Sequence, residues 1–162
     1  MHTALALAVG VVIGAAVVAM VVVLVMRHRM VVPARSPRSF DDTCAAIEAA
    51  VAAADGWSFP MPALDMHAKL AAKNVAPDNL TKIRLYFVCA PAIAGRVLGD
   101  SPRMSAIMPC SWSVYEQTDG SVWVSKMNIP LMAKMFTGEV KRAMGEVGAA
   151  DDRFMDQVLS GR

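Results

Sequence analysis

The stretch that decides the fold is 110–128, CSWSVYEQTDGSVWVSKMN, in which two segments of alternating side chains flank the turn at 118–120. An Asp-Gly pair between two such segments is a strong β-hairpin signal, because both residues tolerate the backbone angles of a tight turn. The stretch therefore predicts two antiparallel strands, over 110–117 and 121–128.

A third strand is predicted upstream, over Leu80–Cys89, where apolar and polar side chains also alternate. The side chains that we expect to face the core are Ile83, Leu85, Phe87 and Cys89, and those that we expect to face water are Lys82, Arg84 and Tyr86. By the same alternation, Cys110 shares the face of Trp112 and Val114. Both cysteines at strand ends are thus expected on core faces.

Helix signals surround the three strands. We expect helices over 42–54, 64–74, 91–99, 130–148 and 151–159, and a short strand at 57–59. Asp41 and Asp42 favour the start of the first helix, Pro91 is suited to a first helical position, and Gly148 is expected to end the longest helix. Helices combined with an antiparallel hairpin predict the α+β class, an antiparallel sheet packed against helices over residues 41–162.

One apolar run, Ala4–Met26, dominates the chain before this domain and contains no charged residue. A helix of these 23 residues would be roughly 35 Å long, which is enough to cross the hydrocarbon core of a bilayer. A cleaved signal peptide is the competing interpretation. However, the N-terminus lacks the basic residues of a signal peptide, and the apolar run is longer than the apolar region of a typical signal peptide. No small-residue cleavage pattern precedes the first arginine either. We expect a permanent transmembrane helix, with residues 1–3 outside the cytoplasm.

Basic residues follow this run, whereas no acidic residue occurs before Asp41. The basic residues that give the topology signal are Arg27, Arg29, Arg35 and Arg38. The positive-inside rule predicts a single-pass protein of the inner (cytoplasmic) membrane, with its C-terminal domain in the cytoplasm. Prolines make 27–40 a predicted linker, and its arginines are also placed to touch anionic lipid headgroups.

Small residues recur every fourth position inside the run, at Ala6, Gly10 and Gly14. This spacing lets two helices approach closely, so it predicts packing against other membrane-protein subunits or a second copy of the chain. A chance match in a helix rich in Ala, Gly and Val is the alternative. With the lipid bilayer, these are the partners that the sequence suggests.

Charge and motifs exclude several classes of function. Of the 16 basic side chains four precede residue 41, which leaves 12 against 14 acidic ones, a net charge of −2 that argues against nucleic-acid binding. The signatures of phosphate-binding loops, dinucleotide-binding folds and serine hydrolases do not occur, so we expect no cofactor. Metal-ligand spacings do not occur either, and we expect most of the 13 methionines to pack as adaptable apolar residues rather than bind copper.

The three cysteines are the remaining candidates for chemistry. Cys44 lies on the apolar stripe of the predicted helix 42–54, which indicates a core residue. Cys89 and Cys110 lie at the ends of predicted strands, where a helix N-terminus or loop amides can lower the pKa of a thiol. Two interpretations stay open for this pair: buried structural residues, or reactive thiols.

The order of several short motifs carries a resemblance. The motifs are Cys89-Ala90-Pro91, Ile107-Met108-Pro109-Cys110, the hairpin, and Asn128-Ile129-Pro130. Their order over about 56–144 resembles the family called domain of unknown function 302, although Ala90 stands where that family usually has Asn and Ile129 separates Asn128 from Pro130. The resemblance implies a compact α+β domain, often dimeric, with no assigned activity. It also implies sulfur or redox contexts, which suit a thiol role.

These observations lead to two expectations for function. The first is a membrane-anchored accessory or docking subunit, facing the cytoplasm and without catalysis of its own, in a larger complex such as a respiratory or photosynthetic one. The alternative is a membrane-tethered thiol or persulfide carrier that uses Cys89 and Cys110.

Overall fold

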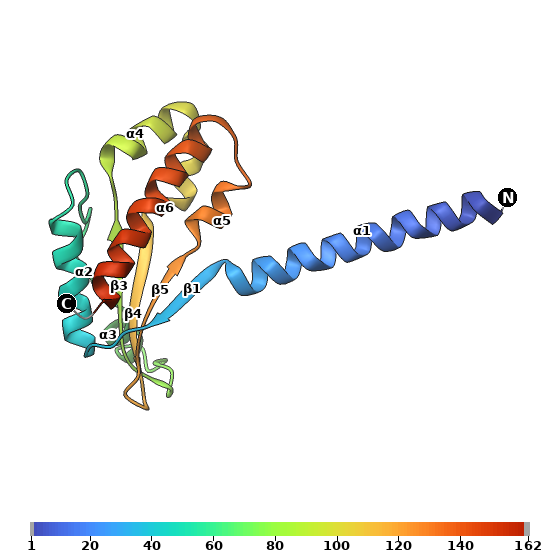
Figure 1. The fold of residues 1–162 in the computed structure, drawn as a ribbon. Helices are drawn as coiled ribbons and strands as arrows, with labels where there is room; N and C mark the ends of the chain where they lie inside the picture. The colour runs from blue at the N-terminus through green and yellow to red at the C-terminus, as the bar shows by residue number, and fades with distance from the viewer. Residues whose placement is uncertain (1, 161–162) are drawn as a thin grey trace. The chain divides into compact units, whose positions relative to one another are not determined.

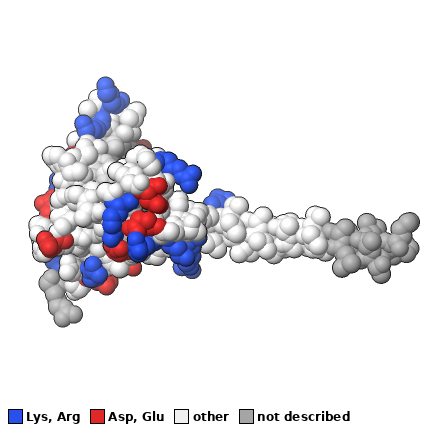
Figure 2. All heavy atoms as spheres, turned by 90° about the horizontal axis from the view of Figure 1, so that it is seen from above, with Lys and Arg blue, Asp and Glu red and all other residues white. Residues whose placement is uncertain are grey.

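The computed structural model describes the backbone of residues 2–160 and the side chains of residues 10–160, in two compact units that meet after Met30. The first unit is helix α1, His2–Arg29. Its segment Gly10–Arg29 has a mean hydropathy of 2.5 and is long and apolar enough to cross a membrane. In Figure 2 the described surface of α1 is uncharged along its length, and blue atoms of basic residues appear only at its end.

The second unit is an antiparallel sheet with helices. Its elements are β1 Val31–Arg35, α2 Phe40–Ala52, β2 Leu64–Asp65, α3 Met66–Ala71, β3 Leu80–Val88, α4 Pro91–Asp100, the 3-10 helix η1 Pro102–Ile107, β4 Cys110–Gln117, β5 Val122–Met127, α5 Ile129–Ala133 and α6 Gly138–Leu159. The five strands lie in the order β1-β5-β4-β3-β2 (Figure 1), and every neighbouring pair is antiparallel. The predicted hairpin and the α+β class are therefore confirmed.

Helices α2 and α6 cover one face of the sheet and form the core with it. The apolar strand side chains buried on this face are Tyr86, Val88, Trp112, Val114, Val122 and Val124. Tyr86 is thus 1% exposed, although we expected it to face water, and Ile83, Leu85 and Phe87 lie half-buried on the opposite face. The register explains the inversion, because Tyr86 lies directly opposite Trp112 and directly opposed residues share a face.

Residues 31–35, which we expected within a linker, instead form the edge strand β1. They pair with β5 from Val31 opposite Met127 to Arg35 opposite Trp123. Pro33 is compatible with this position, because an edge strand leaves one side without ladder hydrogen bonds. Only Met30 separates α1 from the sheet, so the tether between the two units is a single residue.

The helices after the hairpin also differ from the prediction. Helix α5 ends at Ala133, and α6 then runs without a break through Gly148, which we expected to end a helix. Gly148 has a packing role instead, because a Cβ placed there would lie 3.0 Å from Cγ of Pro130. The missing side chain lets α5 and α6 approach closely.

Candidate functional site

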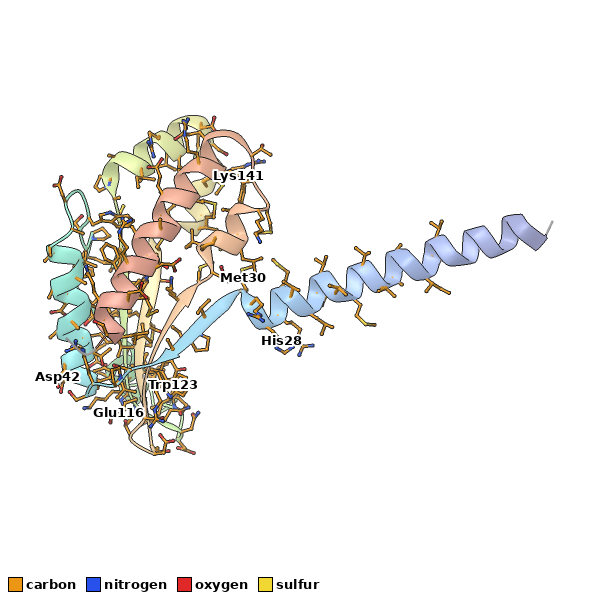
Figure 3. All side chains as sticks on the ribbon, in the orientation of Figure 1. His28, Met30, Asp42, Glu116, Trp123 and Lys141 are labelled. Atoms are coloured by element: carbon orange, nitrogen blue, oxygen red, sulfur yellow. The ribbon has the colours of Figure 1, made fainter. Side chains whose placement is uncertain are left out.

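A cavity of about 70 Å³ lies where β3 ends and β4 begins, and α4, η1, α5, α6, Met127 of β5 and Trp57 also contribute to its wall. Its walls are almost entirely apolar. The hairpin lies at the other end of the sheet, and Figure 3 shows Glu116 and Trp123 there, whereas Lys141 at the start of α6 lies at the cavity end. The cavity is therefore remote from the polar turn.

Cys89 and Cys110, two of the three free cysteines, both line this cavity. Cys110 is directly opposite Val88 in the β3–β4 ladder, and Cys89 is the residue that follows Val88. Two hydrogen bonds of 2.9 Å with the backbone of Ser58 hold Cys89 beyond the end of β3. Cys44 lies elsewhere, on the buried side of α2 in the core, as its position in the sequence predicts.

The side chain of Cys110 is half-buried. Burial raises the pKa of Cys110 to about 11, and the charges of Asp151 and of Cys89 act in the same direction. The possibility that an element end lowers the pKa of this thiol is therefore not realised at Cys110, which is protonated at neutral pH.

A buried ion pair lies beside Cys110, between β5 and α6. Lys126 Nζ donates to Asp151 Oδ2 at 2.5 Å and to Asp152 Oδ1 at 2.8 Å, while Trp112 Nε1 donates to Asp151 Oδ1 at 2.5 Å. Lys126 is 6% exposed and Asp151 4%. Such pairs mark functional sites in some proteins and only fix the packing of the core in others.

The charges of this pair shift each other's titration. Burial raises the pKa of Asp151 despite the opposing effects of Lys126 and Trp112. Burial alone would lower the pKa of Lys126, but Asp151 and Asp152 raise it overall, so Lys126 is charged at neutral pH. The amino-acid sequence alone did not lead us to predict this pair. The available signal is that Lys126 alternates with Val122 and Val124 on the core face of β5.

The second notable surface is the face of the sheet that α2 and α6 leave uncovered. We call it the open face, formed by Ile83, Leu85, Phe87, Ser111, Ser113, Tyr115, Trp123, Ser125 and Met127 together with the exposed Val31 of β1. None of these side chains is buried. A shallow groove crosses it, with serines as its floor and Leu85, Phe87, Val31 and Met127 along its walls.

The predicted topology arginines do not form one cluster. Arg27 and Arg29 occupy the last turn of α1, whereas Arg35 belongs to β1 and Arg38 Nε donates to the backbone carbonyl of Val158 at 3.1 Å. The structure thus incorporates two of the four into the folded domain.

Gly10 and Gly14, two of the three predicted packing residues of α1, have open space beside them. A Cβ placed at Gly10 or Gly14 meets no other atom within 4 Å. Ala6 lies outside the residues whose side chains are described. As for metals, no three His, Cys, Asp or Glu side chains gather at one point among the described residues.

Comparison with known proteins agrees with this architecture. The model of the family described as "Domain of unknown function DUF302" matches residues 32–158, which extends the resemblance through β1, α2 and most of α6. A crystal structure of an uncharacterized conserved DUF302 protein from Bacillus stearothermophilus superposes with a TM-score of 0.69 at 16% identity, covering 80% of this chain and 98% of the other. No curated protein matches the chain. The chain belongs to the DUF302 family, and its domain carries an N-terminal helix apolar enough to span a membrane.

Proposed function

We propose that this protein is a membrane-anchored docking subunit without catalysis of its own, whose open face binds an apolar segment of a membrane-protein partner. The open face carries this proposal. It presents half-buried Leu85, Phe87 and Trp123 on a rigid sheet, whereas the opposite face is sealed by helices. Contiguous apolar surface of this kind is typical of protein-interaction sites.

The chemistry of the groove favours a protein segment as the occupant. Ser111, Ser113 and Ser125 have short side chains, so a helix or an extended segment can approach the strands closely between the apolar walls. The serine hydroxyls can exchange hydrogen bonds with polar groups of that segment. Trp123 adds a large aromatic side chain, a residue type enriched where interfaces are strongest.

The anchor supplies the second half of the proposal. Helix α1 is apolar over its described length and ends with Arg27, His28 and Arg29, which favours a cytoplasmic domain in the inner membrane. With Met30 as the only residue between α1 and β1, the domain stays at the membrane surface. Confinement of this kind raises the effective concentration of the domain for partners in the same membrane.

Native sizing after mild-detergent extraction tests the docking function. We expect a complex much larger than a monomer or dimer for the wild type. Ser113→Arg places a long charged side chain in the groove and should release the protein as a small species. Ala149→Arg on the exposed surface of α6 is the matched control and should leave the complex intact. A wild-type protein that runs alone, or a Ser113→Arg variant that stays in the complex, would contradict the proposal.

A thiol or persulfide carrier is the second candidate, because Cys89 and Cys110 line the same cavity. Because burial raises the pKa of Cys110 and keeps its thiol protonated, we rank this function below docking. Iodoacetamide labelling of the native protein across pH, read residue by residue by mass spectrometry, separates the two. A carrier requires rapid alkylation of Cys89 or Cys110 near neutral pH, and unreactive thiols would remove this candidate.

A further inference from the structure

Sulfur atoms are concentrated around the cavity beyond the two cysteines. Five of the thirteen methionines line it as well, and they come from separate parts of the chain: Met104, Met108, Met127, Met132 and Met144. They belong to η1, the segment after it, β5, α5 and α6. The fold thus gathers thiols and thioethers that the sequence separates.

We propose that this cavity binds one Cu(I) ion through the sulfurs of Cys89 and Cys110 and at least one methionine thioether. Soft thiolate and thioether ligands select Cu(I), whereas hard cations need oxygen ligands. Zinc normally requires four Cys, His or carboxylate ligands. Among the described residues, no three His, Cys, Asp or Glu side chains lie where they could hold one metal ion.

The size of the cavity supports an ion over an organic ligand. Its volume of about 70 Å³ is well below the roughly 300 Å³ or more of pockets that hold drug-sized molecules. It is also about half the volume of the roughly 150 Å³ cavity that accommodates benzene in another protein. A single metal ion needs less room than either, and residues that carry sulfur already line the cavity.

Binding releases protons but transfers no electron. Both cysteines bind as thiolates, because the thiolate is the form of cysteine that binds metals, so the step is Cu⁺ + 2 Cys–SH → [(Cys–S)₂Cu]⁻ + 2 H⁺. The thioethers bind as neutral ligands, copper stays Cu(I), and the complex carries one negative charge.

Competition between the full-length protein in detergent micelles and a chromogenic Cu(I) chelator, under anaerobic reducing conditions, measures the binding. We expect one Cu(I) per chain, with release of two protons and an ultraviolet thiolate-to-copper band. The Cys89→Ser and Cys110→Ser variants should bind roughly 100-fold or more weakly, since even the loss of an outer-shell partner costs 10–100-fold in metal affinity. Cys44→Ala, outside the cavity, should bind as the wild type does.

Methionine variants keep the test decisive if a cysteine variant misfolds. Leucine preserves the volume and apolar character of methionine but removes the sulfur. We expect Met→Leu at one or more of the five cavity positions to weaken Cu(I) binding, and Met155→Leu in the core outside the cavity to leave it unchanged. Binding that does not saturate, or that survives in the Cys89→Ser/Cys110→Ser double variant, would overturn the copper site. Neither result bears on the docking function, which the size of the native complex tests.

Discussion

Replacing Lys126 by methionine should destabilise the domain strongly, because it leaves the Asp151 carboxylate buried without its cation. Asp151 Oδ2 accepts from Lys126 Nζ at 2.5 Å, and two unit charges at that separation attract by about 7 kcal/mol at an effective dielectric constant of about 20. Desolvation of both groups offsets most of that attraction while the pair is intact. Removing one partner leaves the other charge buried and uncompensated, which lowers the free energy of unfolding by about 3–5 kcal/mol.

Replacing the other partner, Asp151, by asparagine should reduce the stability of the domain less than Lys126→Met does. In Asp151→Asn, Lys126 keeps Asp152 as a partner at 2.8 Å, and the Asn side chain still accepts from Trp112 Nε1. We expect a loss of about 1–3 kcal/mol, the cost of a weakened buried hydrogen-bonding group. In the Lys126→Met background, however, Asp151→Asn removes the stranded charge and should restore stability. The same substitution thus changes sign between the two backgrounds.

Urea unfolding of the full-length protein in non-ionic detergent measures these changes. Tryptophan fluorescence reports on the domain alone, because Trp57, Trp112 and Trp123 all lie beyond α1. With a slope of about 2 kcal/mol per M, a loss of about 4 kcal/mol lowers the midpoint by about 2 M urea. Lys141→Met, at an exposed position of α6 (Figure 3), is the control and should change stability by no more than about 0.5 kcal/mol.

Two results would refute the reasoning. One is a loss below about 1 kcal/mol in Lys126→Met, which would mean that water reaches Asp151 and solvates it. The other is an equal loss from Asp151→Asn with and without Lys126, which would mean that the two side chains do not interact.

Two further predictions concern the packing of α6 and the alkaline stability of the domain. Gly148→Ala should cost about 1–3 kcal/mol, because its Cβ would meet Pro130 Cγ at 3.0 Å, whereas Gly145→Ala in the same helix meets open space and should stabilise by up to about 1 kcal/mol in the same urea assay. Burial raises the pKa of Tyr86, whose hydroxyl donates to Glu48 Oε1 at 2.9 Å. The unfolded chain therefore releases this proton first, and stability should fall by up to about 1.4 kcal/mol per pH unit above pH 10. Urea midpoints measured across this range should show a shallower fall in Tyr86→Phe, and an unchanged slope would contradict the assignment.

The features that the sequence predicted correctly depend on local signals. The turn at 118–120 and the alternation on both sides of it need no distant contact to specify a hairpin. The core position of Cys44 follows from helical spacing, and the helix that carries it begins at Phe40, with Ser39 Oγ accepting from the Asp42 amide. An apolar run long enough to span a membrane is likewise legible without tertiary structure.

Features that depend on pairing between distant segments were not predicted from the sequence. Val31–Arg35 becomes a strand only because β5 offers it an edge, and the proline within it suppresses the local strand signal. The cavity requires β3, β4 and four helical segments to meet, so the thiols of Cys89 and Cys110 and the methionines around them have no common spacing in the sequence. Neither the site nor its composition can be read from one segment alone.

The inverted face of β3 shows how such a failure arises and what would correct it. Alternation divides a strand into two sides but does not say which side the helices cover, and a shift of one residue in register exchanges them. Leu85 and Phe87 look like core residues by hydropathy, while Tyr86 looks polar beside Arg84. The assignment of β4 was sound, because Trp112 and Val114 do face the helices. Since Tyr86 lies opposite Trp112, the pairing of the two strands decides the face of β3, and its own composition does not.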